Sequence, residues 1–194
     1  EALLRWNSSE LGFLPPVKFI EIAEDTQFII PLGKWVLKTS CEFLKKLHRK
    51  GHENLTMSVN ISVLQLLQTD FIDFVMSTLN AFQLKPEHLV LEITESILIQ
   101  SFENINSKLQ ELKSLGIGVA LDDFGNGYSS LSYLMQLPIS TLKMDKSFIN
   151  DIITNSGNRV LVGHIISLGR NLGIKVIAEG VEDTEQLDFL VENQ

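Results

Sequence analysis

Short apolar segments alternate with amphipathic segments along most of this chain of 194 residues. The apolar segments are rich in β-branched residues, and the segments between them have the apolar spacing of helices. Strands that are apolar on both faces, each followed by a helix, are typical of a parallel sheet covered by helices. The predicted strands are residues 55–62, 88–94, 117–123, 140–145 and 174–180, with residues 1–6 as a candidate sixth.

An α/β fold of this kind is either an open doubly wound sheet or a (β/α) barrel. None of the predicted strands is followed by a glycine-rich phosphate-binding turn, which weighs against a nucleotide-binding open sheet. The amphipathic stretches 104–116 and 160–173 end in Gly116 and Gly173, which are suitable helix-terminating residues directly before the next strand. The length suits a single domain with one sizeable core.

The composition is that of a soluble globular domain, with 44% hydrophobic and 21% charged residues. A net charge of −8 weighs against binding to DNA, RNA or a membrane surface. A small phosphorylated ligand stays open, because a bound metal ion can reverse the local charge. No apolar run approaches the roughly 20 residues of a membrane-spanning helix, and no signal peptide opens the chain. The single cysteine, Cys41, excludes an internal disulfide and predicts a buried thiol in a reducing compartment, so we expect a cytoplasmic location.

Polar side chains stand where each predicted strand ends. The intervals between them are 32, 30, 21 and 36 residues, counted from Asn60 to Glu92, Asp122, Lys143 and Glu179, and most are about one βα unit. A barrel collects the carboxyl ends of its strands around one mouth, where active sites of that fold lie. We therefore expect these residues to meet: Asn60, Glu92, the adjacent Asp122 and Asp123, Lys143, and Glu179.

Carboxylate and amide oxygens are the ligands that Mg²⁺ and Mn²⁺ prefer. Asp122 could bridge two such ions about 4 Å apart, an arrangement that serves phosphoryl transfer. Asn60 and Glu92 would complete the coordination of the first ion, and Asp123 would bind the second.

The remaining two residues suit the handling of water or phosphate. Lys143 would place a positive charge on a phosphate oxygen or orient a water, and Glu179 could hold or deprotonate that water. A simpler alternative stays open for each residue alone: an acid or Asn60 at a strand end can cap the following helix, and Lys143 can be solvated.

Seven segments together resemble the EAL domain, the family of bacterial cyclic di-GMP phosphodiesterases. They follow in the family's order and at similar intervals, so the resemblance covers the whole chain. The segments are EALLRW at residues 1–6, PPVKFIEIAE at 15–24, and then SVNIS, LEITES, DDFGNGYSS, LKMDKSFI and VIAEGVE.

The resemblance implies a modified TIM barrel with one antiparallel strand. It also implies that the domain hydrolyses cyclic di-GMP to linear pGpG with two Mg²⁺ or Mn²⁺ ions. The implied ligands of the first ion are Glu1, Asn60, Glu92 and Asp122, and those of the second are Asp122 and Asp123.

Other residues match family positions outside the metal ligands. Lys143 and Glu179 match the residues that hold and activate the attacking water. Glu95 resembles the residue that steadies the loop after Asp123, Glu182 lies close to the metal site, and Arg5 resembles a contact to ligand phosphate.

The chain departs from the family pattern in three places. Asn126 replaces the usual threonine of D-D-F-G-T-G. The family's first strand and its C-terminal Q-G-Y segment have no counterpart, so we expect residues 1–194 to be an EAL domain whose barrel is incomplete at both ends. The resemblance further implies a homodimer, fused GGDEF or sensory domains, and a full-length protein that can be membrane-anchored.

Two other functions stay open beside hydrolysis. One is a catalytically inactive EAL module that binds cyclic di-GMP or a protein partner as a receptor. The other is a different metal-dependent barrel enzyme, such as an enolase-like lyase with Lys143 as base.

Overall fold

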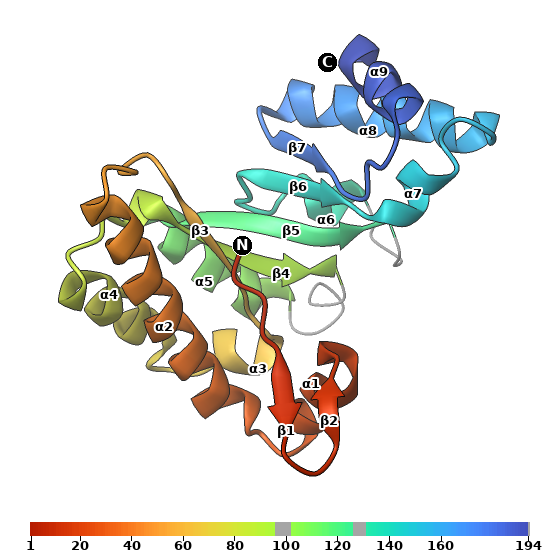
Figure 1. Ribbon diagram of the computed structural model, residues 1–194. Helices are drawn as coiled ribbons and strands as arrows, with labels where there is room; N and C mark the ends of the chain where they lie inside the picture. Colours follow the sequence, from red (N-terminus) through yellow and green to blue (C-terminus); the bar gives the residue numbers. More distant parts are fainter. Residues whose placement is uncertain (96–101, 126–130, 194) are drawn as a thin grey trace.

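The centre of the protein is a parallel sheet of five strands (Figure 1). The structure is a computed structural model that describes residues 1–95, 102–125 and 131–193. All five predicted strands are confirmed. They are β3 (Met57–Asn60), β4 (Leu89–Thr94), β5 (Gly118–Phe124), β6 (Thr141–Met144) and β7 (Lys175–Ala178).

The winding of the sheet decides between the two candidate folds. The strands lie in the order β3-β4-β5-β6-β7, so each connection moves one strand further in the same direction. A doubly wound sheet reverses its direction at a switch point, whereas a (β/α) barrel does not. The described sheet is therefore a run of barrel strands, as predicted. All five run parallel, so the antiparallel strand that the resemblance implies is not among them.

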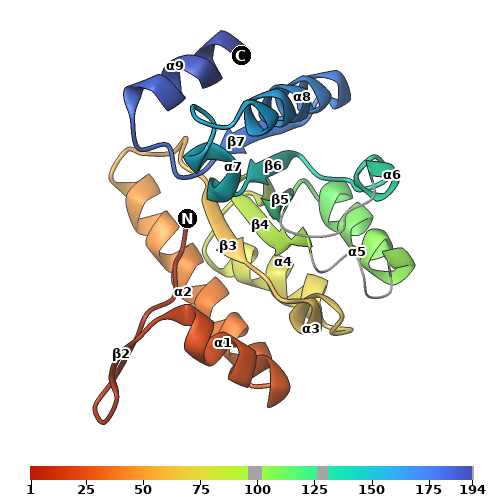
Figure 2. The ribbon, with the colours of Figure 1, turned by 90° about the vertical axis from the view of Figure 1, so that its right-hand side faces the viewer.

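Helices flank the strands they connect. Figures 1 and 2 show α5 beside β5 and α8 beside β7, and α2 contacts β3. The helices of the described residues are α1 (Pro16–Asp25), α2 (Ile29–Arg49), α3 (Val63–Leu66), α4 (Phe71–Ala81), α5 (Phe102–Ser114), α6 (Leu131–Leu134), α7 (Lys146–Asn150), α8 (Ser156–Leu172) and α9 (Thr184–Asn193), with a 3₁₀ turn at Pro86–His88.

Two helix boundaries follow from local chemistry. Gly173 takes the left-handed conformation, with φ of 68°, directly after α8, as its predicted role requires. Residues 63–82 form the two helices α3 and α4, with a turn at Leu67 to Asp70 between them.

The candidate sixth strand is realised only in part. Ala2 forms a single parallel bridge with Val59, and its amide donates to the carbonyl of Ser58 at 2.9 Å. The start of the chain therefore lies beside β3 (Figure 1). Trp6 already belongs to a separate antiparallel hairpin of β1 (Trp6–Ser8) and β2 (Gly12–Leu14).

The core is apolar and lies between the sheet and its helices. Cys41 belongs to this core, as predicted, and burial raises the pKa of its thiol to about 11. None of the helices in the described part of the chain combines the length and apolar character that crossing a membrane requires.

Candidate active site

A buried lysine holds four carboxylates together at the carboxyl ends of the strands. Lys143 is 5% exposed. Its Nζ lies 2.8 Å from Glu179 Oε1, 2.9 Å from Glu92 Oε2 and 3.0 Å from Asp122 Oδ2. The fourth carboxylate, Glu1, is 3.7 Å away. The structure thus brings together most of the residues that the sequence placed at strand ends.

The register of the sheet sets the position of each side chain along the direction of the strands. Asn60 pairs with Glu92, so these two residues are level at the ends of β3 and β4. Asp122 pairs with Thr94, two residues further along. Glu179 directly follows β7. Because parallel strands end on the same edge, residues far apart in sequence meet there.

A bulge in β5 explains how two adjacent acids serve one edge. Side chains of a regular strand point alternately to opposite faces. The register of β5 against β6 shifts between Leu121 and Phe124, and Asp123 has a positive φ of 54°. The amide of Asp123 donates to Asp122 Oδ1 at 2.9 Å, which ties the two residues together. Bulges of this kind re-aim side chains, and both acids line the same cavity.

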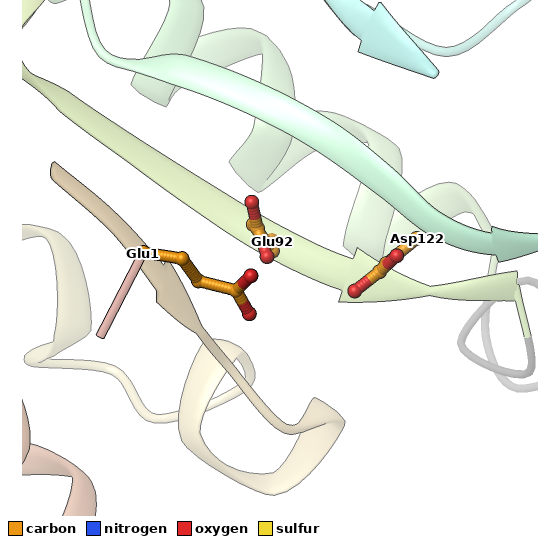
Figure 3. A group of neighbouring side chains, drawn as sticks. All are labelled: Glu1, Glu92 and Asp122. Atoms are coloured by element: carbon orange, nitrogen blue, oxygen red, sulfur yellow. The ribbon is translucent and has the colours of Figure 1, made fainter. Parts of the chain in front are cut away.

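Glu1 and Asn60 join the cluster from the edge of the sheet. Asn60 Nδ2 donates to Glu1 Oε1 at 2.9 Å. Oxygens of Glu1, Glu92 and Asp122 all lie within 4.8 Å of one another, and Figure 3 shows the three side chains close together over β4.

Burial and charge shift the pKa values of the cluster. Burial raises the pKa of Glu92, although the hydrogen bond from Lys143 opposes the shift. Partial burial and the neighbouring Asp122 raise the pKa of Asp123. Burial lowers the pKa of Lys143, but its hydrogen bonds to Glu179, Glu92 and Asp122 outweigh this and leave the pKa above its ordinary range. The surrounding acids therefore favour the charged form of Lys143.

A cavity of about 510 Å³ opens beside the cluster. Its lining includes Glu1, Asn60, Glu92, Asp122 and Asp123 on one side, and residues of α1 and α2 on the other. Arg5 also lines it, and its guanidinium donates to the carbonyl of Leu4 at 2.8 Å. The cavity therefore combines acidic groups, one arginine and an apolar wall, which suits a ligand with both charged and apolar parts.

Two further predicted residues, Glu95 and Glu182, lie in the loops that directly follow strands β4 and β7. Glu95 is buried, and its Oε2 accepts a hydrogen bond from the amide of Gly125 at 2.8 Å, so it anchors the start of the loop after Asp123. The Glu182 side chain is exposed in the loop after β7. Asn126 lies outside the described residues.

Two buried glutamines near the site were not predicted from the sequence. Gln65 shares a capping box with Ser62, two residues after Asn60, and Gln186 forms a similar box with Asp183 in the loop after Glu179. The signal was present, because a capping residue followed three positions later by Gln is a helix-start signature.

The donor set fits a hard divalent cation. Four carboxylates surround one ammonium, so the cluster keeps an excess of negative charge. Three of them offer oxygens within 4.8 Å of one another, and the amide of Asn60 adds a further oxygen-bearing group. Carboxylate and amide oxygens are the ligands of Mg²⁺ and Mn²⁺, whereas sites for softer metals use Cys or His.

The chain matches a known family along nearly its whole length. The family model described as "EAL domain" matches residues 1–193. The chain is 40% identical over 190 residues to the bifunctional diguanylate cyclase/cyclic di-GMP phosphodiesterase MucR of Pseudomonas aeruginosa, covering 98% of this chain and 28% of that protein. It is 40% identical over 193 residues to the cyclic di-GMP phosphodiesterase PdeR of Escherichia coli, covering 100% of this chain and 29% of that protein. The chain thus spans little more than a quarter of the length of these relatives.

Solved structures agree with the fold. The PaMucR phosphodiesterase in complex with c-di-GMP matches with a TM-score of 0.92 and 39% identity, over 98% of this chain and 77% of that chain. The EAL enzyme Bd1971, bound to cAMP and cyclic di-GMP, matches with a TM-score of 0.91 and 35% identity, over 98% of this chain and 53% of that chain.

Proposed function

Because this chain belongs to the EAL domain family, we propose that it hydrolyses cyclic di-GMP to linear pGpG with the help of two divalent metal ions. The observation that carries the proposal is the ion-pair network of Lys143 with Glu92, Asp122 and Glu179. It puts chemically active groups from four successive strands at one edge, beside a cavity of about 510 Å³. The relatives whose names describe this activity add support.

The acids of the cluster are the proposed metal ligands. Glu1, Asn60, Glu92 and Asp122 would hold one Mg²⁺ or Mn²⁺, and Asp122 and Asp123 would hold the other. When bound, such ions neutralise phosphate charge and make a bound water more acidic. The mutual approach of Glu1, Glu92 and Asp122 supports the first set, and the bulge that turns Asp123 toward the cavity supports the second.

Lys143 and Glu179 are the proposed water-handling pair. Hydrolysis adds a water oxygen to phosphorus and breaks the bond between phosphorus and the 3′ oxygen. The 3′ oxygen takes up a proton, so the product carries a 5′ phosphate and a 3′ hydroxyl. The side chain of Glu179 is 36% exposed, the largest value among the four acid side chains around Lys143, so it can reach a water and accept its proton. The ammonium of Lys143, 2.8 Å away, holds that carboxylate in place.

The surroundings of Lys143 disfavour the lyase alternative. A lysine that acts as a base must be a neutral amine. Three carboxylates lie within 3.0 Å of the Nζ of Lys143, and they stabilise its ammonium form over the neutral amine. The receptor alternative keeps the same cavity and differs in the outcome of the assay below.

Incubation of the protein with cyclic di-GMP and Mn²⁺, followed by separation of the products, tests the proposal. We expect pGpG, and none when a chelator removes the metal. Glu179→Gln should lower the rate by about 10²–10⁴-fold, because it removes the proton acceptor. Glu185→Gln makes the same change at an exposed site on α9 and should keep the parental rate. Cyclic di-GMP binding without any pGpG would refute the enzyme and support the receptor.

The finer family properties also stand as proposals. We propose that residues 1–194 are the EAL part of a larger protein with GGDEF or sensory domains, that it acts in the cytoplasm, and that it forms a homodimer. The modest share of each relative that the chain covers supports the first point. Gel filtration at several protein concentrations tests the dimer.

A further inference from the structure

The loop between β7 and α9 carries Glu179 and is pressed against the element that follows Lys143. The amide of Glu179 donates to the carbonyl of Met144 at 3.2 Å. Gly180 has φ of 72°, and a Cβ there would lie 2.6 Å from the Cβ of Lys146 at the start of α7. Only glycine fits this close approach without strain.

Gln186 makes the side-chain links that fasten this loop. It is 5% exposed. Its Oε1 accepts hydrogen bonds from the amides of Glu182 at 2.7 Å and Asp183 at 3.2 Å. Its Nε2 donates to the carbonyl of Ile149 in α7 at 3.2 Å. One amide group therefore joins the loop after β7 to the helix after β6.

We propose that Gln186 is a positioning residue that holds Glu179 at its distance from Lys143, an inference that rests on the proposed function of this pair. β6 and α7 place Lys143, and the loop after β7 places Glu179, so a bond between α7 and this loop fixes the two relative to each other. The 2.8 Å contact of Lys143 with Glu179 depends on that alignment.

The exposure of Glu179 gives such a bond a role. The Glu179 side chain is 36% exposed, so packing alone holds it less firmly than the buried Glu92 and Asp122. Small displacements of a reacting group are costly, because about 1 Å can change a rate by about a hundredfold.

Two variants separate the two halves of the Gln186 contact. Gln186→Leu removes all three bonds. Gln186→Glu keeps the acceptor for the amides of Glu182 and Asp183 but loses the donor to Ile149. If the link to α7 positions Glu179, kcat should fall by about tenfold to a hundredfold in both variants, while KM and the Mn²⁺ concentration for half-maximal rate stay parental.

Two control variants make the same physical changes elsewhere. Asn155→Ala removes the N-cap of α8, so it lowers the thermal midpoint without touching the loop. Leu187→Glu adds the charge of Gln186→Glu at an exposed neighbouring position. Both should keep the parental kcat. A purely structural Gln186 would instead give parental kcat in the Gln186 variants at temperatures where they are folded, and that result overturns the proposal.

Hydrogen exchange tests the fastening without any turnover. In Gln186→Leu the amides of residues 179–183 should exchange about tenfold faster or more, whereas those of 118–124 in β5 should not change. Unchanged exchange at 179–183 overturns the proposal. If the parent protein forms no pGpG, the proposed function fails, and exchange still decides whether Gln186 holds the loop.

Discussion

The two ends of the parallel sheet differ in the residues that they bury. The described residues contain four buried charged side chains, and each lies in the carboxyl-terminal half of a strand or directly after it: Glu92, Glu95, Asp122 and Lys143. The Lys143 network joins three of these, and Glu95 anchors the adjoining loop.

The amino ends of the strands are built for packing. Leu89, Leu112 and Ile117 are almost completely buried there. The polar groups at this end include the rings of His48 and His88, which meet edge to face with centroids 4.6 Å apart.

This difference separates the chemistry from the stability of the domain. Buried charges cost free energy even when they are paired, so a fold retains them where its activity needs them. Hydrophobic packing at the opposite end stabilises the fold without contacting ligand. Substitutions at the carboxyl end should therefore mainly lower activity, whereas substitutions at the amino end should mainly lower stability.

The largest effect is expected at the carboxyl end, from Asp122→Asn. It removes the carboxylate that the proposal places between two ions, and kcat for pGpG formation should fall by about 10³-fold or more. Asp151→Asn is the matched control, because Asp151 is exposed after α7, and it should keep the parental kcat. Unchanged turnover in Asp122→Asn would refute the two-ion assignment.

Lys143→Met should lower both stability and activity, so it is the expected exception to the separation of activity and stability between the two ends of the sheet. Without the ammonium, the carboxylates of Glu92 and Asp122 stay buried and repel each other. The free energy of unfolding without divalent metal should fall by about 3–5 kcal/mol in urea titrations. Saturating Mn²⁺ should restore part of it, since a metal ion replaces the lost charge. Lys146→Met, at an exposed lysine, is the control. Equal stability of parent and Lys143→Met would show that the network is not stabilising.

Leu112→Ala tests the amino end of the sheet, where we expect a loss of stability without a loss of activity. Leu112 is fully buried near the end of α5, and truncation should lower the free energy of unfolding by about 2–5 kcal/mol. At temperatures where the variant is folded, kcat should stay parental. Leu115→Ala, at a side chain that is 36% exposed, should lose only about 0.5 kcal/mol. A loss of kcat in folded Leu112→Ala would mean that the two ends are coupled.

The sequence predicted the repeated features of the fold. Buried strands are apolar on both faces, so β3 to β7 could be recognised from local residues, and the polar residues at their ends followed from the barrel geometry. The positions of Glu92, Asp122 and Lys143 could be inferred in this way.

Features that depend on distant contacts could not be predicted. The bulge at Asp123 arises from the pairing of β5 with β6, and the hairpin of β1 and β2 depends on where the chain turns away from β3. The role of Gln186 required the position of Ile149 in another helix. Local patterns contain the capping box but not its tertiary partner.

The smallest effect is expected from His88 at the amino end. Burial lowers the pKa of His88 below its ordinary value of 6.5, with further lowering from His48, Lys85 and Lys45 and an opposing effect of Glu87. Its Nδ1 is buried without a hydrogen-bond partner among the described residues. The unfolded chain therefore binds this proton more readily than the folded one. Stability should fall as the pH drops below the unfolded pKa and continue to fall until the pH passes the lower folded pKa.

His88→Gln should remove this part of the acid sensitivity. Urea unfolding between about pH 7 and pH 5 should give a shallower decline of the free energy of unfolding in the variant than in the parent. The kcat at neutral pH should not change, because the residue lies at the opposite end of the sheet from Lys143. Parallel pH curves for variant and parent would assign the acid sensitivity to other groups. A change in kcat would contradict the separation of the two ends.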